Sequence, residues 1–236
     1  MSTALTKEPP FKNILGFASL LDEKGEAMHK SKGNAIEFNE AAEKGGVDIM
    51  RWLYLTQNPE NNLLFGYSVT DEIRRRFYLI LWNSYKFFID YATLTDWQCH
   101  SVEQEDLTLL DKWILAKLTQ LVLLVNEKLD KFDAATASNT IEDFIVKDFS
   151  TWYIRRSRDR VGLDAKSRDR DTALSVMYGV LVTISKILAP FMPFISEEIF
   201  KNLTSEASVH LEDYPLVDKS LLVERLIKEM LLVRAV

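Results

Sequence analysis

The residues best suited to chemistry form one short polar stretch, Met28-His29-Lys30-Ser31-Lys32-Gly33-Asn34. Its two lysines supply positive charge, and its glycine lets the backbone turn sharply or come close to a ligand. These properties suit a mobile loop that holds a polyphosphate. Most loops rich in Lys and Gly are ordinary solvated turns, so the composition of this stretch leaves both interpretations open.

A second candidate site is basic. Seven Lys or Arg side chains stand against three Asp between residues 155 and 170, and a second basic run is Arg74-Arg75-Arg76. Guanidinium groups suit phosphates and unstacked RNA bases, although the cluster could equally be a solvated helix end. The formal net charge of -6 argues against a protein that coats nucleic acid by charge alone. A nucleic-acid site would therefore be local.

Composition narrows the class of protein. With 236 residues, 47% of them hydrophobic, the chain can bury a large core and hold one or two domains. Its single cysteine, Cys99, forms neither an internal disulfide nor a zinc site, which favours a reducing cytoplasm and a buried or incidental thiol. The chain shows no apolar leader and no run of about 18 apolar residues, so we expect neither secretion nor membrane spanning.

The elements that must position these residues fall into two parts. Residues 1 to about 66 hold most of the glycines and predict a small α/β segment. The elements predicted there are a strand or two within 11–21, a turn at 22–25, a helix that Asn39 caps and Gly45-Gly46 ends, a helix over 47–55 and a hinge over 58–67.

The second part, residues 67–236, is predicted to be mainly α. After Thr70, apolar residues recur at helical spacing, in runs that start at Ile73, Leu110 and Leu174, and Pro190 and Pro193 break the last run. Helices with one apolar stripe each must cover one another, so we expect an antiparallel helical bundle. The tryptophans are expected in its core rather than in a base-stacking platform.

The stretch from Met28 to Tyr54 resembles the KMSKS loop and following helices of class I aminoacyl-tRNA synthetases, and most of all the isoleucyl branch. Met28, Lys30 and Ser31 match that pattern, whereas Ala27 stands where the first lysine belongs and His29 replaces a serine. The resemblance implies that Met28, His29, Lys30 and Ser31 contact ATP, which acts with Mg²⁺ in the complete enzyme. It implies that Lys30 is catalytic and stabilises the leaving pyrophosphate, and that His29 is a tolerated variant.

Three later stretches resemble the anticodon-binding domain of the same enzymes, in matching order along the chain. They are Leu81-Trp82-Asn83-Ser84-Tyr85, then Ser150-Thr151-Trp152-Tyr153-Ile154-Arg155-Arg156-Ser157-Arg158, and then Leu188-Ala189-Pro190-Phe191-Met192-Pro193-Phe194-Ile195-Ser196-Glu197-Glu198. The resemblance implies that residues 67–236 bind the anticodon stem-loop of tRNA(Ile), with Arg155, Arg156 and Arg158 as the nucleic-acid-binding residues.

Several parts of such a synthetase are missing from the sequence. His29, His100 and His210 are the only histidines, and none stands in the His-x-Gly-His element that contacts ATP. The first half of the Rossmann domain, the editing domain and the zinc-binding tail of some isoleucyl enzymes are missing too. We therefore expect residues 1–66 to be the end of a catalytic domain, the other catalytic and editing domains to be partners, and the isolated chain to be inactive.

Two alternatives remain open. A valyl or leucyl relative shares most of these motifs, although Trp-Tyr-Ile-Arg-Arg-Ser-Arg favours the isoleucyl branch. A helical interaction protein with no RNA role would need a continuous exposed apolar stripe on the bundle, whereas a synthetase needs an exposed basic face.

Overall fold

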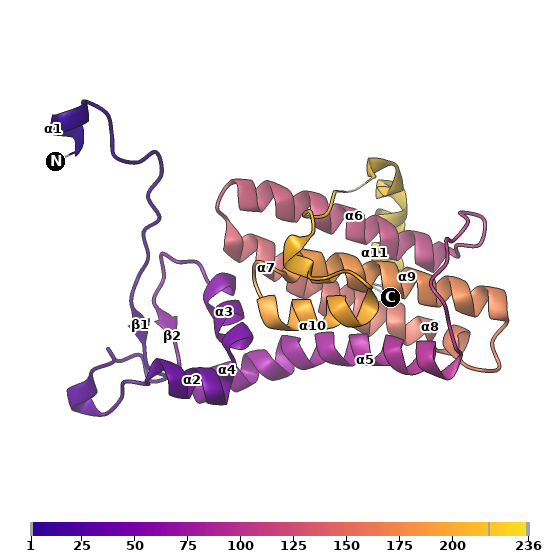
Figure 1. Cartoon of the computed structure of the whole chain (residues 1–236), viewed down its shortest axis with the longest axis horizontal. Helices are drawn as coiled ribbons and strands as arrows, with labels where there is room; N and C mark the ends of the chain where they lie inside the picture. The colour runs from indigo at the N-terminus through magenta and orange to yellow at the C-terminus, as the bar shows by residue number, and fades with distance from the viewer. Residues whose placement is uncertain (1, 217, 235–236) are drawn as a thin grey trace.

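The computed structural model describes residues 2–216 and 218–234. Over these residues the chain is mainly α: an antiparallel helical bundle follows a small segment with two short strands, as predicted (Figure 1). In chain order the elements are α1 (Ser2–Thr6), β1 (Leu20–Leu21), η1 (Lys30–Lys32), α2 (Phe38–Gly45), α3 (Val47–Thr56), β2 (Leu63–Leu64), α4 (Tyr67–Ile73), η2 (Arg74–Tyr78), α5 (Leu79–Leu94), α6 (Leu109–Asp130), α7 (Ala134–Asp143), η3 (Phe144–Ile154), α8 (Arg155–Val161), α9 (Ser167–Leu188), α10 (Pro193–Leu203), η4 (Val209–Leu211), η5 (Lys219–Leu221) and α11 (Glu224–Arg234). Of the η elements, η2 and η3 are π-helical and the others are 3₁₀ turns.

The bundle buries the predicted apolar stripes. Figure 1 shows α5, α6 and α9 running lengthwise beside one another, with α7, η3 and α8 forming a further rod. The stripe of α9 is fully enclosed, and α9 ends at Leu188, before Pro190, as predicted. Among the described residues, α9 is also the one helix long and apolar enough to cross a membrane. Since 61% of its apolar window is buried, it has the burial of a core helix here.

The first part of the chain has less regular structure than predicted. Of the expected strand within 11–21, only Leu20–Leu21 is extended and paired, in a parallel two-stranded sheet with Leu63–Leu64. The preceding Phe11, Ile14 and Phe17 side chains are largely exposed. The predicted strand within 11–21 is therefore confirmed only at its last two residues, because an apolar stretch does not form a strand without a neighbour to pair with.

The cap predicted for α2 was also wrong. The Glu37 carboxylate, rather than Asn39, caps this helix by accepting hydrogen bonds from the backbone N–H groups of Asn39 and Glu40. The predicted end of the helix is confirmed, because Gly46 adopts φ 86°, a conformation that favours glycine. An Asx-type residue near a helix start is a strong signal, but a longer carboxylate two residues earlier can satisfy the same N–H groups.

Polar contacts fasten the segment 58–67, predicted as a hinge, at the start of α4. The Glu23 carboxylate accepts hydrogen bonds from Ser68 N at 2.7 Å and Ser68 Oγ at 2.5 Å. Gly66 permits this approach, since a Cβ there would lie 2.1 Å from Glu23 Cγ. Further along, Arg74 donates to the carbonyl oxygens of Lys44 and Gly45 at the end of α2. A domain boundary at residue 66 stays a prediction.

Candidate functional sites

The lysine loop forms a single tight turn. Lys30–Lys32 make one turn of 3₁₀ helix, closed by hydrogen bonds from Lys32 N to His29 O and from Gly33 N to Lys30 O. Gly33 adopts φ 72°, the left-handed conformation that lets the chain leave the turn. The Lys30 and Ser31 side chains are exposed, and no ion pair between described residues involves Lys30. Its ammonium group is therefore available to an anionic ligand.

Asn34 braces this loop from within, a role that the sequence did not reveal. Its side-chain oxygen accepts from His29 N at 2.9 Å, and its Nδ2 donates to Ala27 O and to Asp22 Oδ2 at 2.8 Å. The hydrogen bond from Asn34 is the main cause that lowers the pKa of Asp22 below its ordinary value. Only the amide at this position could have signalled the brace, because Asn can both accept from and donate to backbone groups.

The predicted ATP-contacting residues are adjacent in the chain but are not equally presented. His29, Lys30 and Ser31 are exposed, whereas Met28 is half-buried and packs against the core. Met28 thus anchors the start of the loop, and the exposed turn after it carries the polar groups.

The three predicted RNA-contacting arginines lie together at the start of α8. Arg155, Arg156 and Arg158 are exposed, and no ion pair between described residues involves any of them. The guanidinium of Arg156 lies over the Trp152 ring, 4.2 Å from the ring centroid. Among the described residues, none of the three pairs with Asp148, which precedes the cluster, or with Asp159, which follows it. Asp148 instead binds Lys117 and Arg234. We call Arg155, Arg156 and Arg158 the arginine cluster.

Arg160, next to this cluster, is internal. Its guanidinium donates to both Asp111 carboxylate oxygens at 2.8 Å and to Asp169. The buried Tyr153 hydroxyl also donates to Asp111, at 2.6 Å. Burial alone would lower the pKa of Arg160, but its hydrogen bonds to Asp111 and Asp169 raise that pKa. Part of the basic region seen in the sequence therefore stabilises the core.

The second basic run is mostly structural as well. Arg74 binds Asp71, and Arg76 Nε lies 2.8 Å from Glu142 Oε1. Glu142 also accepts a hydrogen bond from Trp52 Nε1, which ties α7 to α3. Only Arg75 of this run is exposed without an ion pair to another described residue.

Cys99 is exposed, so of the two predicted alternatives, a buried or an incidental thiol, the structure excludes the buried one and fits the incidental one. Within residues 2–216 and 218–234, no group of three or more His, Cys, Asp or Glu side chains could hold a metal ion.

Two family models match parts of the chain. Residues 111–236 match a family model described as the anticodon-binding domain of tRNA ligase. Residues 1–64 match one described as class I tRNA synthetases (I, L, M and V).

Curated relatives are isoleucine–tRNA ligases. The chain is 40% identical to that of Dehalococcoides mccartyi (strain CBDB1) over 100% of its own length. It is 36% identical to that of Thermus thermophilus over 93% of its length. The chain spans about a quarter of these relatives, 24% and 22% of their lengths.

A solved structure shares the fold. It is the agnB2 LeuRS of Agrobacterium radiobacter K84 in a ternary complex with tRNA and LeuAMS, with a TM-score of 0.65 and 19% identity, over 86% of this chain and 24% of that one. Since the anticodon-binding model covers more than half of the residues, the chain belongs to the family of tRNA ligase anticodon-binding domains, joined here to a class I tRNA synthetase segment.

Proposed function

We propose that this chain is the tRNA-binding portion of an isoleucine–tRNA ligase and binds the anticodon stem-loop of tRNA(Ile). The observation that carries the proposal is the arginine cluster, which presents exposed guanidinium groups from one helix end of an anticodon-binding domain. Each guanidinium offers a planar set of donors that suits phosphates and unstacked bases. The choice of the isoleucine tRNA rests on the names of the curated relatives.

The lysine loop would serve ATP in the complete enzyme. Lys30 and the exposed turn at His29 and Ser31 fit a polyphosphate, because one tight turn carries an exposed ammonium group, which forms no ion pair with another described residue, beside an exposed hydroxyl. Lys30 would stabilise the negative charge that develops as pyrophosphate leaves. Mg²⁺ would accompany the nucleotide and share its charge.

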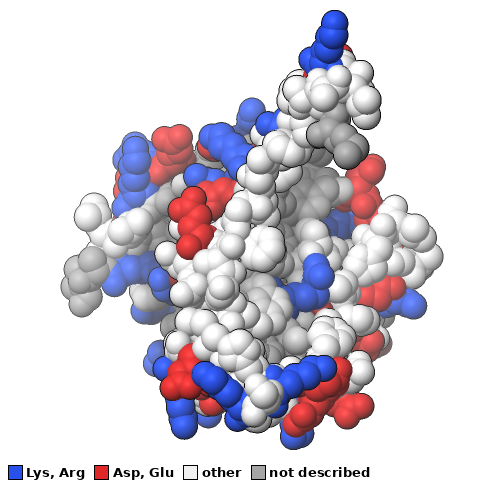
Figure 2. Space-filling model, turned by 90° about the vertical axis from the view of Figure 1, so that its left-hand side faces the viewer, with Lys and Arg blue, Asp and Glu red and all other residues white. Residues whose placement is uncertain are grey.

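The remaining catalytic and editing domains would be the protein partners. Apart from charged residues at its margins, the face that the first part of the chain presents is a long band of uncharged residues (Figure 2). Phe11, Ile14, Leu15 and Phe17 are 55 to 83% exposed on this segment. A two-stranded parallel sheet is rarely stable alone, so further strands of a catalytic domain would cover this apolar surface. The assembly would work in the cytoplasm, where tRNA is charged.

Binding to a panel of purified tRNAs tests the proposal. Fluorescence anisotropy should show that the chain binds isoleucine tRNA more tightly than valine or leucine tRNA. The isolated chain should also show no isoleucine-dependent pyrophosphate exchange. Equal affinity for all three tRNAs would remove the isoleucine assignment, and a chain that binds none of them would refute the RNA-binding role.

A further inference from the structure

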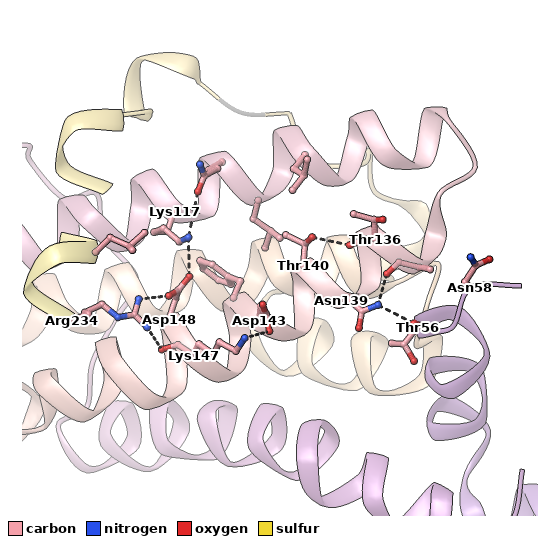
Figure 3. A pocket seen from close by; sticks show the side chains of 16 residues that line it. Thr56, Asn58, Lys117, Thr136, Asn139, Thr140, Asp143, Lys147, Asp148 and Arg234 are labelled. Atoms are coloured by element: carbon pink, nitrogen blue, oxygen red, sulfur yellow. Dashed lines mark hydrogen bonds and ion pairs between the residues drawn. The ribbon is translucent and has the colours of Figure 1, made fainter. Parts of the chain in front are cut away.

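A groove of about 910 Å³ opens between α6, α7, η3 and α11 (Figure 3). Leu121, Leu124 and Phe144 contribute apolar surface to it, and amides, hydroxyls and charged groups line the rest. Figure 3 shows the charged groups gathered at one end, around Asp148, and the amides of Asn58 and Asn139 at the other end, beside the end of α3. Such a groove combines an apolar surface for a flat ring with polar groups that can orient it.

The charged end carries a net positive charge. Lys117 Nζ lies 3.1 Å from Asp148 Oδ2, and Arg234 binds the same carboxylate while donating to Lys147 O at 3.0 Å. Lys147 Nζ lies 2.7 Å from Asp143. Three cations thus face two carboxylates. The Lys147 side chain is 63% exposed, so its ammonium group can move from Asp143 to a phosphate at little cost.

The amide end holds a fixed hydrogen-bond acceptor. Asn139 Nδ2 donates to Thr56 O at 2.9 Å and to Ala135 O at 2.8 Å. Both amide hydrogens are used, which fixes the amide plane and leaves Oδ1 to accept a hydrogen bond. The exocyclic amino groups and ring N–H groups of unpaired bases are donors of the required kind.

The groove borders the arginine cluster through one aromatic side chain, Trp152. Asp148, Trp152 and Arg156 are spaced by four residues, so they follow one side of the rod formed by η3 and α8. The Trp152 ring joins the two sites, because the guanidinium of Arg156 lies 4.2 Å from its centroid and that of Arg234 lies 5.1 Å away. A ligand held by the arginine cluster would therefore reach the groove along a single surface.

We propose that this groove receives an unpaired nucleotide of the RNA loop whose phosphates the arginine cluster holds. The proposal rests on the proposed function and adds a second, base-binding part to that site. An RNA loop matches the features of the groove better than an acidic peptide does. It brings a flat base for the apolar surface, N–H donors for Asn139 and a phosphate for Lys147, whereas a peptide of acidic side chains would leave the apolar surface uncovered.

Filling the groove tests the proposal. Thr140 of α7 lines it and is half-buried, so Thr140→Trp should block it without opening the core. Thr93→Trp, at an exposed helical position of α5, is the matched control. The probe is the anticodon stem-loop of isoleucine tRNA with 2-aminopurine at single loop positions. Base stacking or burial is worth roughly 1–3 kcal/mol, so Thr140→Trp should weaken binding about tenfold or more.

Two further readouts define the site. One loop position should increase its 2-aminopurine emission on binding to wild type and to Thr93→Trp, and lose that increase with Thr140→Trp and with Asn139→Ala. The salt dependence of affinity should flatten by no more than roughly one unit in Thr140→Trp, because only the Lys147 contact is lost and the phosphate contacts of the arginine cluster remain. Circular dichroism confirms that each variant is folded, and Asn139→Ala serves if Thr140→Trp does not fold.

The outcomes separate this proposal from the proposed function. If both groove variants keep wild-type affinity and emission while Arg156→Ala weakens binding, the groove proposal is overturned and the RNA-binding role stands. A wild-type chain that does not bind the hairpin overturns both. Binding of an aspartate-rich peptide that Thr140→Trp abolishes, with hairpin affinity unchanged, would overturn the groove proposal in favour of an acidic protein partner.

Discussion

Asp48 in α3 caps α10 at Ile195: its Oδ2 atom accepts a hydrogen bond from Ile195 N at 2.7 Å, and its Oδ1 atom accepts from Phe194 N at 3.3 Å. One turn further along α3, Arg51 donates to the carbonyl oxygens of Pro190 and Phe191 at 2.7 and 2.9 Å. The second helix after the lysine loop, α3, is thus fastened to the turn between α9 and α10. These contacts link the first part of the chain, which carries the lysine loop, to the helical bundle.

Removing this cap should destabilise the chain. Asp48→Ala leaves the N–H groups of Phe194 and Ile195 at the start of α10 without an acceptor, which should lower the free energy of unfolding by about 1–2 kcal/mol. Burial raises the pKa of Asp48 and so makes its charged form costly. Asp48→Asn, which keeps one acceptor oxygen and carries no charge, should lose less than half as much. Urea denaturation measures both. Equal losses for the Ala and Asn variants would exclude the capping role.

The buried ion pair of Asp111 and Arg160 should contribute more to the free energy of unfolding than the Asp48 cap does. Asp111 is fully buried, forms the capping box of α6 with Thr108 and accepts from Arg160 and Tyr153. The Arg160 side chain is only 15% exposed, and Asp111→Ala removes one of its two carboxylate partners. The free energy of unfolding should therefore fall by about 3–5 kcal/mol. Asp130→Ala, at the exposed end of the same helix, should change stability by less than about 0.5 kcal/mol. If Asp111→Ala changed the free energy of unfolding as little as Asp130→Ala, the stabilising role of the buried ion pair would be contradicted.

The same pair predicts a pH dependence. Burial alone would raise the pKa of Asp111, but hydrogen bonds from Arg160, Thr108 and Tyr153 outweigh it and hold that pKa below its ordinary value of 3.8. A carboxylate whose pKa is lower in the folded state contributes its full stability above 3.8 and loses it as the pH falls through the folded value. The stability difference between wild type and Asp111→Asn should therefore be constant from about pH 7 to 5 and shrink below about pH 4. A stability difference between the two proteins that grows as the pH falls would show that folding does not lower the pKa of Asp111.

The sequence predicted what depends on local pattern. Period-3.6 stripes gave the bundle, and the glycine pair and Pro190 gave helix ends, because each acts within one turn of its own position. Contacts between distant residues, such as Asp48 with Ile195 or Asp111 with Arg160, carry no periodic signal. For that reason the sequence did not separate Arg160, which is internal, from the exposed arginines beside it. It also predicted no structural role for Asn34 or Glu37. The groove also combines residues from α3 to α11, so no single segment of the sequence could predict it.

Lys30 is expected to act on chemistry rather than on RNA binding. An ammonium group directed at transition-state charge typically contributes roughly 3 kcal/mol, so Lys30→Ala should slow pyrophosphate exchange about a hundredfold in a reconstituted complete enzyme. Its affinity for tRNA should stay nearly unchanged, because the loop lies in the first part of the chain, away from the arginine cluster. Lys131→Ala, an exposed lysine of the bundle, is the control and should retain the wild-type rate. Unaltered exchange in Lys30→Ala would remove this lysine from the mechanism.

If the arginine cluster binds phosphates of tRNA, its arginines should contribute to the salt dependence of tRNA affinity. A contact between a cation and a phosphate releases counterions, so the logarithm of affinity falls linearly with the logarithm of salt concentration, and each lost contact flattens that slope by roughly one unit. We expect this change for at least one of Arg155→Ala, Arg156→Ala and Arg158→Ala. Arg225→Ala, an exposed arginine of α11 that pairs with Glu229, should keep the wild-type slope. The Arg156 guanidinium also stacks on the Trp152 ring. Arg156→Ala therefore removes a stacked planar group as well as a charge, and this variant should lose the most affinity for tRNA. Identical slopes and affinities in all these proteins would show that the cluster is only a solvated helix end.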